Sequence, residues 1–239
     1  MNSQELKIEN HIIAFIDILG SSEAIKTDAE GSLNIVHKAY ANSLSMFQEL
    51  FGGLYIQPSV KIFSDNIVVA VPYKEDRFKR SAFLAVAMMS AIIQVEFLKK
   101  GWLTRGGISS GSFFADEVMV WGTALVKAYK LESEIAVYPR VVIDPELIGD
   151  LHLALSPAEH CIIWLRQDKD RLFYIEYLNH CLKNAELFAM GLFKIIEENL
   201  ARHQGNTKVC QKWLWLSSYL KERLPELGPQ NRESHDNKE

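Results

Sequence analysis

The sequence predicts an α+β fold in which a mainly antiparallel sheet carries helices on one face and a mainly helical extension follows. Three observations predict this class. Apolar, β-branched runs alternate with amphipathic stretches in the order β, α, α, β, β, α, β, β, α. Ser64-Asp65-Asn66 separates two such runs, as expected of a hairpin turn. Beyond residue 141 the apolar runs become short, and two long amphipathic stretches follow them.

The elements of the first part of the chain follow from local periodicity. Residues 33–51 place apolar side chains three or four positions apart, as in an amphipathic helix, and Gly52-Gly53 ends it. The apolar content of residues 76–100 predicts a buried helix that stops at Gly101. In chain order we expect a strand at 11–17, a short helix from Ser21, a helix at 32–51, a hairpin at 54–71, a helix at 76–100, strands at 102–114 and 118–120, and a helix at 123–137. This order is that of a ferredoxin-like or palm-type sheet.

The rest of the chain has a different character. We expect short strands at 140–144, 161–165 and 172–177, and amphipathic helices at 182–203 and 208–224. The last twelve residues are polar and lack periodicity, which predicts disorder. The predicted organisation is a first domain at 1–144, an α/β extension packed on it at 145–227, and a disordered tail at 228–239.

Composition limits the partners and the location. The chain has 239 residues, 48% of them apolar, and a net charge of −4, so nothing in the composition indicates a broad basic surface for nucleic acid or anionic membranes. The most apolar stretch, 82–93, is too short to cross a bilayer, and residues 1–10 are too polar for a signal peptide. Cys161, Cys181 and Cys210 lack zinc-site spacing and suit a reducing compartment. We therefore expect a cytoplasmic protein with no membrane span and no nucleic-acid partner.

Two aspartates carry the most specific chemistry. Asp17 ends the first strand, and Asp65 lies at the tip of the hairpin. On neighbouring strand ends, two carboxylates can bridge two divalent ions for displacement at phosphorus, and their hard oxygen ligands favour Mg²⁺ or Mn²⁺. The plainer alternative is that both aspartates are turn or capping residues. Phosphate oxygens would be held by backbone N–H groups where a helix opens, at Leu19, Gly20, Ser21 and Ser22.

Four short blocks, spread in order over residues 11–137, resemble the motifs of one known family. The first block, Phe15-Ile16-Asp17-Ile18-Leu19-Gly20-Ser21, resembles the first metal motif of the class III nucleotidyl cyclases. Ser64-Asp65 stands where the family usually has Gly-Asp, and Arg105-Gly106-Gly107-Ile108-Ser109-Ser110-Gly111 resembles its Arg-x-Gly-Ile strand. Trp121-Gly122, Ala128 and Leu131-Glu132-Ser133 resemble its following helix.

The resemblance implies a metal and phosphate site. Asp17, the adjoining Ile18 and Asp65 would bind two Mg²⁺ or Mn²⁺ ions, and Arg105 would contact the triphosphate. A role for Arg105 in pairing with a surface acid is the alternative.

The resemblance also implies contacts from a second subunit. Lys61 matches the position that reads the base in purine cyclases, and Lys130 matches the transition-state arginine. In the family both act across a head-to-tail homodimer. Tyr55 is a candidate for the wall of the base pocket. The alternatives are a solvated strand residue for Lys61, an exposed helix face for Lys130, and a core or rim position for Tyr55.

Three departures concern the base and ribose. Met119 replaces a polar base-reading residue, Val126 replaces the ribose-orienting asparagine, and Lys130 lacks the planar fork of arginine. With these changes the helix most resembles the pyrimidine cyclases of bacterial Pycsar anti-phage systems. Members of that group make cyclic UMP or cyclic CMP, which activates an effector that depletes NAD or damages the membrane.

The sequence therefore predicts a homodimeric cyclase that converts UTP, or less favourably CTP, to the 3′,5′-cyclic monophosphate and pyrophosphate. Its effector would respond to the product without contacting the enzyme. Two alternatives stay open: a class III adenylate or guanylate cyclase, and a catalytically silent domain that binds nucleotide or a partner.

Overall fold

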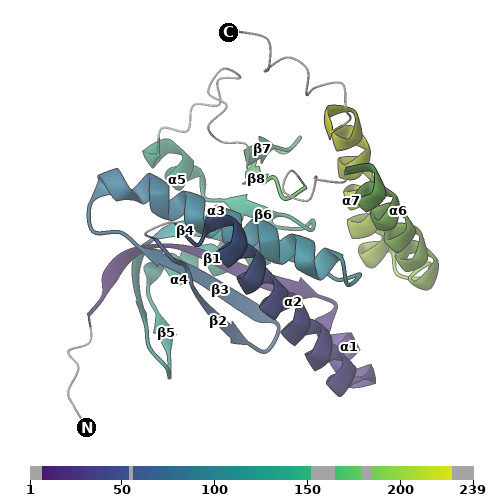
Figure 1. The fold of residues 1–239 in the computed structure, drawn as a ribbon, viewed down its shortest axis with the longest axis horizontal. Coiled ribbons are helices and arrows are strands. Elements are labelled where there is room, and N and C mark those ends of the chain that lie inside the picture. Colours follow the sequence, from purple (N-terminus) through teal and green to yellow (C-terminus); the bar gives the residue numbers. More distant parts are fainter. Residues whose placement is uncertain (1–6, 54–55, 152–164, 179–184, 228–239) are drawn as a thin grey trace.

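The computed structural model describes residues 7–53, 56–151, 165–178 and 185–227. A single sheet has the strand order β2-β3-β1-β4-β6-β8-β7, with β5 also paired to β4 (Figure 1). The strands are β1 (Glu9–Leu19), β2 (Ser59–Phe63), β3 (Asn66–Pro72), β4 (Leu103–Ala115), β5 (Val120–Trp121), β6 (Val141–Ile143), β7 (Leu165–Gln167) and β8 (Phe173–Ile175). The helices are α1 (Ser21–Thr27), α2 (Ala29–Phe51), α3 (Asp76–Leu98), α4 (Thr123–Lys130), the π-helix η1 (Leu131–Ile135), α5 (Pro145–Asp150), α6 (Ala185–Arg202) and α7 (Thr207–Leu227).

Strand β1 lies between β3 and β4 and has buried residues on both of its faces. Its even-numbered residues from Ile12 to Ile18 join the main core, which also contains residues of α2 and α3. Its odd-numbered residues Ile13 and Phe15 join a smaller core beneath α4. Because side chains alternate along a strand, Asp17 lies on the α4 face, at the end of the strand.

The predicted α+β class is confirmed, and Figure 1 shows α2 and α3 lying side by side across one face of the sheet. The sequence predicted helices on one face of the sheet only. In the structure α4 packs on the opposite face as well. Two glycines of β4 make room for it. A Cβ on Gly107 would lie 2.5 Å from the carbonyl oxygen of Ala128, and one on Gly111 would lie 2.6 Å from Oγ1 of Thr123.

Helix α3 is, among the described residues, the one helix long and apolar enough to cross a membrane. Its most apolar window is 89% buried within the fold, against the sheet and α2. The expectation of a buried helix around residues 82–93 is therefore confirmed.

The Gly107→Ala variant tests the close packing of α4 on β4. Its new Cβ would lie 2.4 Å from Cβ of Leu131 as well as against the Ala128 backbone. Because backbone must move to relieve this overlap, we expect the free energy of unfolding to fall by about 2 kcal/mol in urea denaturation. Gly149→Ala is the control, since a Cβ there meets nothing within 4 Å. Equal stability of Gly107→Ala and the unmodified chain would contradict this packing.

The hairpin turn falls at the expected residues. Within it Ser64, with φ of 56°, adopts the left-handed conformation. The fourth helix of the expected order is found as α4, and the π-helix η1 continues it to Ile135.

The extension continues the same sheet. Strand β6 runs parallel to β4, and β8 pairs antiparallel with β6, so that β7 forms the far edge. Helices α6 and α7 pack against each other at one end of the molecule (Figure 1). Residues 54–55, most of the strand expected at 161–165, and the tail at 228–239 lie outside the described residues. The domain division at residue 144 stays a prediction.

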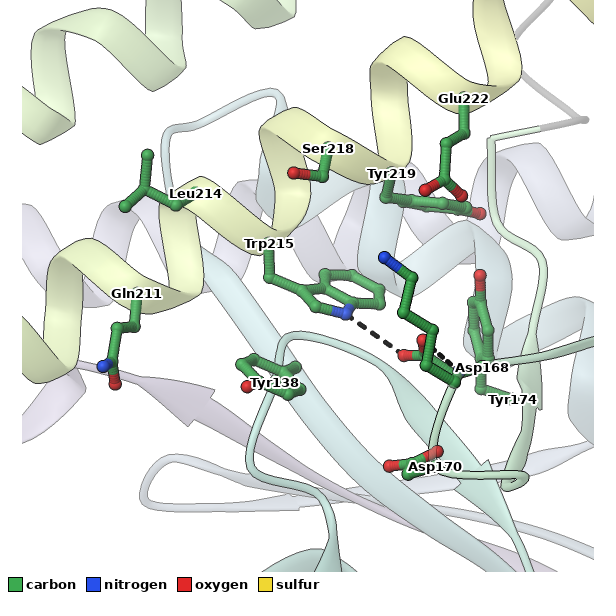
Figure 2. Close-up of a pocket in the computed structure, with 11 residues that line it drawn as sticks. Tyr138, Asp168, Asp170, Tyr174, Gln211, Leu214, Trp215, Ser218, Tyr219 and Glu222 are labelled. Carbon is green, nitrogen blue, oxygen red and sulfur yellow. Dashed lines mark hydrogen bonds between the residues drawn. The ribbon is translucent and has the colours of Figure 1, made fainter.

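Buried charge joins the extension to the sheet. The guanidinium of Arg140, which is 1% exposed, pairs with Asp168 at 2.5 Å and with Asp170. The indole Nε1 of Trp215 on α7 donates to the same Asp168 carboxylate at 3.1 Å (Figure 2). These contacts hold α7 next to the segment that leads into β6.

Candidate active site

Asp17 and Arg105 face each other across the β1–β4 ladder. The antiparallel register pairs these two residues directly, and Nε of Arg105 lies 3.3 Å from Oδ2 of Asp17. On its other side, Asp17 is paired with Asn66 of β3. Residues far apart in sequence thus meet at one end of the central strands.

Asp65 is held next to this strand end by its backbone and side chain. The N–H of Ile18 donates to the carbonyl oxygen of Asp65 at 3.0 Å. The Ser21 hydroxyl donates to Oδ2 of Asp65 at 2.6 Å, and the Asn66 amide donates to Oδ1 at 3.1 Å. The predicted metal residues Asp17, Ile18 and Asp65 are therefore neighbours in the fold.

The two aspartates differ in their electrostatics. Burial raises the pKa of Asp17 above its usual value; Arg105 opposes that rise, and the nearby Asp65 adds to it. The pKa of Asp65 is lowered, first by the hydrogen bond from Ser21. A bound cation would relieve the repulsion that Asp65 exerts on the Asp17 carboxylate.

The two carboxylates fit Mg²⁺ or Mn²⁺ only as part of a site that the substrate completes. No group of three or more His, Cys, Asp or Glu side chains in the described ranges is arranged to hold a metal. Mg²⁺ sites at nucleotides commonly use one or two carboxylates, with substrate phosphates and water supplying the other ligands. Asp17 and Asp65 match that pattern.

The predicted phosphate-binding turn connects β1 to α1. Gly20 has a φ of +83°, a left-handed conformation that favours glycine. Ser21 is buried and its hydroxyl is bonded to Asp65, while Ser22 is exposed. Leu19 pairs with Leu103 at the end of the ladder. The turn is thus connected to the Asp65 carboxylate by a direct hydrogen bond.

Arg105 has a second acidic partner that sequence reasoning missed. Its Nη2 lies 2.7 Å from Oε1 of Glu132, and its Nη1 donates to the carbonyl oxygen of Ala136 at 3.3 Å. Glu132 is 4% exposed; burial raises its pKa, and Arg105 opposes that rise. The signal was the acidic residue in Leu131-Glu132-Ser133, to which no role was given. Arg105 therefore pairs with Asp17 and with the buried Glu132. The alternative, pairing with a surface acid, is not what the structure has.

The two lysines expected to act across a dimer lie apart from this cluster. Lys61 is paired with Val68, a residue of the smaller core, so its side chain lies on the α4 face. Lys130 is the last residue of α4 and is exposed. Neither lysine forms an ion pair with Asp17 or Asp65 within the part of the chain that the structure describes. Tyr55 lies outside the described residues.

Apolar side chains are exposed around β5 and α4. Trp121 is 66% exposed, and Met119 and Val126, which occupy the altered base and ribose positions, are 48% and 54% exposed. Tyr129 is also exposed, and its ring packs edge-on against Phe15. Neighbouring exposed apolar residues are typical of a surface that another protein covers.

One hollow lies near the site, and another lies in the extension. One, of about 390 Å³, adjoins Ser21 and Asp65 but is lined mainly by apolar residues of α1, α2 and β2. The other, of about 500 Å³, lies between α7 and the β7–β8 turn and contains none of the predicted site residues (Figure 2). The candidate site is defined by the carboxylate cluster and not by either hollow.

No family model matches the chain, and neither does any curated protein. Among solved structures it is similar to the guanylyl cyclase domain of the RhoGC fusion protein from the aquatic fungus Blastocladiella emersonii, at 13% identity and a TM-score of 0.47, over 71% of this chain and 96% of that one. It is also similar to a class III adenylyl cyclase-like ATP-binding protein from Pseudomonas aeruginosa, at 10% identity and a TM-score of 0.48, over 74% of this chain and 41% of that one. An adenylate/guanylate cyclase/hydrolase from Silicibacter pomeroyi is similar at 16% identity and a TM-score of 0.39, over 71% and 95%. Likeness at this level carries no functional conclusion.

Proposed function

We propose that this chain is a class III nucleotidyl cyclase that converts UTP, or less favourably CTP, to the 3′,5′-cyclic monophosphate and pyrophosphate. The observation that carries the proposal is the meeting of Asp17, Asp65 and Arg105 at one end of the central strands. These residues come from three of the four motif blocks. The arrangement supplies acidic metal ligands beside a cation, as displacement at phosphorus requires.

The reaction forms a bond between the ribose 3′-oxygen and the α-phosphorus and breaks the bond from that phosphorus to the bridging oxygen of pyrophosphate. Two divalent ions, when bound, supply the Lewis acidity that lowers the pKa of the 3′-hydroxyl and neutralises the leaving pyrophosphate. Asp17, Asp65 and the backbone at Ile18 would hold these ions. The hydroxyl proton passes to solvent, because no side chain is assigned as a general base.

The other residues would bind and orient the triphosphate. The Leu19–Ser22 backbone and Arg105 would contact its β- and γ-phosphates, and Glu132 would fix the plane of the Arg105 guanidinium. The exposed apolar surface around β5 and α4 supports a homodimer, in which Lys130 and Lys61 of one subunit would reach the nucleotide of the other. Lys130 would then neutralise the pentavalent phosphorus.

The preference for a pyrimidine rests on Met119 and Val126, since the methionine sulfur is only a weak acceptor for a purine and the valine side chain has no group that can hydrogen-bond to a ribose. The accompanying role would be that of second-messenger synthase in bacterial anti-phage defence. Val126 and Lys130, which replace the family's ribose-orienting asparagine and transition-state arginine, favour a second candidate, a silent domain that binds a nucleotide without turnover.

Pyrophosphate release from each of ATP, GTP, CTP and UTP, in Mn²⁺ and in Mg²⁺, tests the proposal. We expect turnover of UTP, with slower turnover of CTP and none of the purines, because Met119 replaces one of the two base-reading residues of the purine cyclases. Turnover of a purine alone would contradict the pyrimidine assignment. Metal-dependent binding of a nucleotide without pyrophosphate release would favour the silent domain.

A further inference from the structure

The hollow between α7 and the β7–β8 turn has aromatic walls. Its volume of about 500 Å³ lies within the usual range for sites that bind small molecules. Four rings from separate parts of the chain line this aromatic hollow: Tyr138, Tyr174, Trp215 and Tyr219. Trp215 stacks on Tyr138 with ring centroids 5.8 Å apart, and Tyr174 meets Tyr219 edge-on at 5.8 Å (Figure 2). Rings packed on one another in this way form a fixed surface for an apolar ligand group.

One polar group that lines the aromatic hollow lacks a partner among the described residues. Tyr174 is 4% exposed, yet its hydroxyl forms no hydrogen bond within the described ranges, whereas the neighbouring Tyr219 donates to Glu176. Figure 2 shows the Tyr174 hydroxyl directed toward α7. Burial raises the pKa of this phenol, so it stays a neutral hydroxyl whose oxygen can accept a hydrogen bond. Because a buried polar group without a partner is costly, this hydroxyl favours a ligand that supplies one.

Carboxylates outnumber cations around the aromatic hollow. Asp168 and Asp170 in the β7–β8 turn share one guanidinium, that of Arg140, which is 1% exposed. Glu222 of α7 also lines the hollow, and it forms no ion pair with a residue that the structure describes. Lys169 is the one lysine or arginine among the described lining residues. The surroundings therefore favour a positively charged ligand and disfavour a phosphate or a carboxylate.

We infer that the aromatic hollow binds an organic ammonium ion with an apolar body, such as an alkylamine or an arylamine. The rings would contact the apolar body and attract the cation. An ammonium N–H would donate to the Tyr174 hydroxyl, and the Glu222 carboxylate would neutralise the charge. A quaternary ammonium fits less well because it has no N–H group. The inference does not depend on the proposed function, since the hollow contains none of the residues assigned to the nucleotide.

The aromatic hollow lies on the segment that also contacts Arg105. Two residues before Tyr138, the carbonyl oxygen of Ala136 accepts from Arg105 at 3.3 Å. Two residues after Tyr138, the carbonyl oxygen of Arg140 accepts from the N–H of Gly106 at 3.1 Å. A ligand held against Tyr138 would therefore contact a segment that is bonded to β4 on both sides of that residue.

Calorimetric titration of the full chain with phenethylamine, which is protonated at neutral pH, tests the site without requiring turnover. Phenethyl alcohol has the same ring and chain without the charge, and phenylacetate carries the opposite charge. We expect the amine to bind at least about 10-fold more tightly than either, because only the amine supplies both a cation and an N–H donor.

Two variants locate the binding. Tyr174→Phe should weaken binding of the amine by about 10-fold and leave the fold intact, because the hydroxyl has no described partner to lose. Glu222→Gln should weaken it by about 3-fold, since this carboxylate is exposed. Tyr40→Phe on α2 and Glu197→Gln on α6 are the matched controls and should bind normally.

Equal affinity for the amine and the alcohol would overturn the inference, and so would failure of the amine to bind. Unchanged affinity in Tyr174→Phe would also overturn it, with thermal denaturation as the check on folding. If Tyr174→Phe does not fold, the exposed substitution Glu222→Gln gives the deciding comparison. Binding of the amine by a chain that releases no pyrophosphate would uphold the site and remove the catalytic proposal. Turnover without binding of the amine would do the reverse.

Discussion

The Asp65→Ala variant is expected to release pyrophosphate from nucleoside triphosphates no faster than a reaction without protein. Asp65 supplies one of the two carboxylates at the end of the central strands, and a site with Asp17 alone would hold the metal ions poorly. Its loss also leaves the buried Ser21 hydroxyl without its acceptor. The measurement is initial pyrophosphate release with UTP and Mn²⁺.

Asp65→Asn separates charge from shape in this test. The amide oxygen can still accept from Ser21, so the turn should persist while the metal ligand is weakened. We expect Asp65→Asn to be inactive as well, with unchanged stability in urea. Glu23→Ala, which removes an exposed carboxylate of α1, is the control and should keep full activity. Normal turnover in either Asp65 variant would remove Asp65 from the catalytic machinery.

Replacing Arg105 is expected to affect both rate and stability. Arg105→Met should lower the rate of pyrophosphate release by about 10²–10³, the usual effect of losing a donor that stabilises developing charge. It should also lower the free energy of unfolding by about 3 kcal/mol, because the buried carboxylate of Glu132 loses its cation. Urea denaturation and pyrophosphate release measure the two effects independently.

The double variant Arg105→Met, Glu132→Gln distinguishes the two roles. Removing the buried charge should restore most of the lost stability, since no unpaired ion then remains at that position. The rate should stay low if Arg105 contacts the triphosphate. Recovery of both rate and stability would mean that Arg105 serves only to neutralise Glu132.

Much of the fold was predictable because it depends on local spacing. The continuous apolar run that leads to Asp17, the turn residues around Asp65 and the apolar face of α3 are each encoded within a few neighbouring positions. The prediction of helices on one face was incomplete because the space in which α4 packs on the sheet depends on Gly107 and Gly111. Glycine in a strand indicates a close approach but not which element makes it.

The sequence by itself determined the α+β class, the strand that ends in Asp17 and the hairpin that presents Asp65. Periodicity and turn chemistry are properties of neighbouring residues, and they are enough to place a side chain on an element. Only the tertiary structure decided which groups share the site: the Glu132 carboxylate pairs with Arg105, and the Ser21 hydroxyl donates to Asp65. These contacts depend on strand order and helix packing, and short-range spacing carries no information about them.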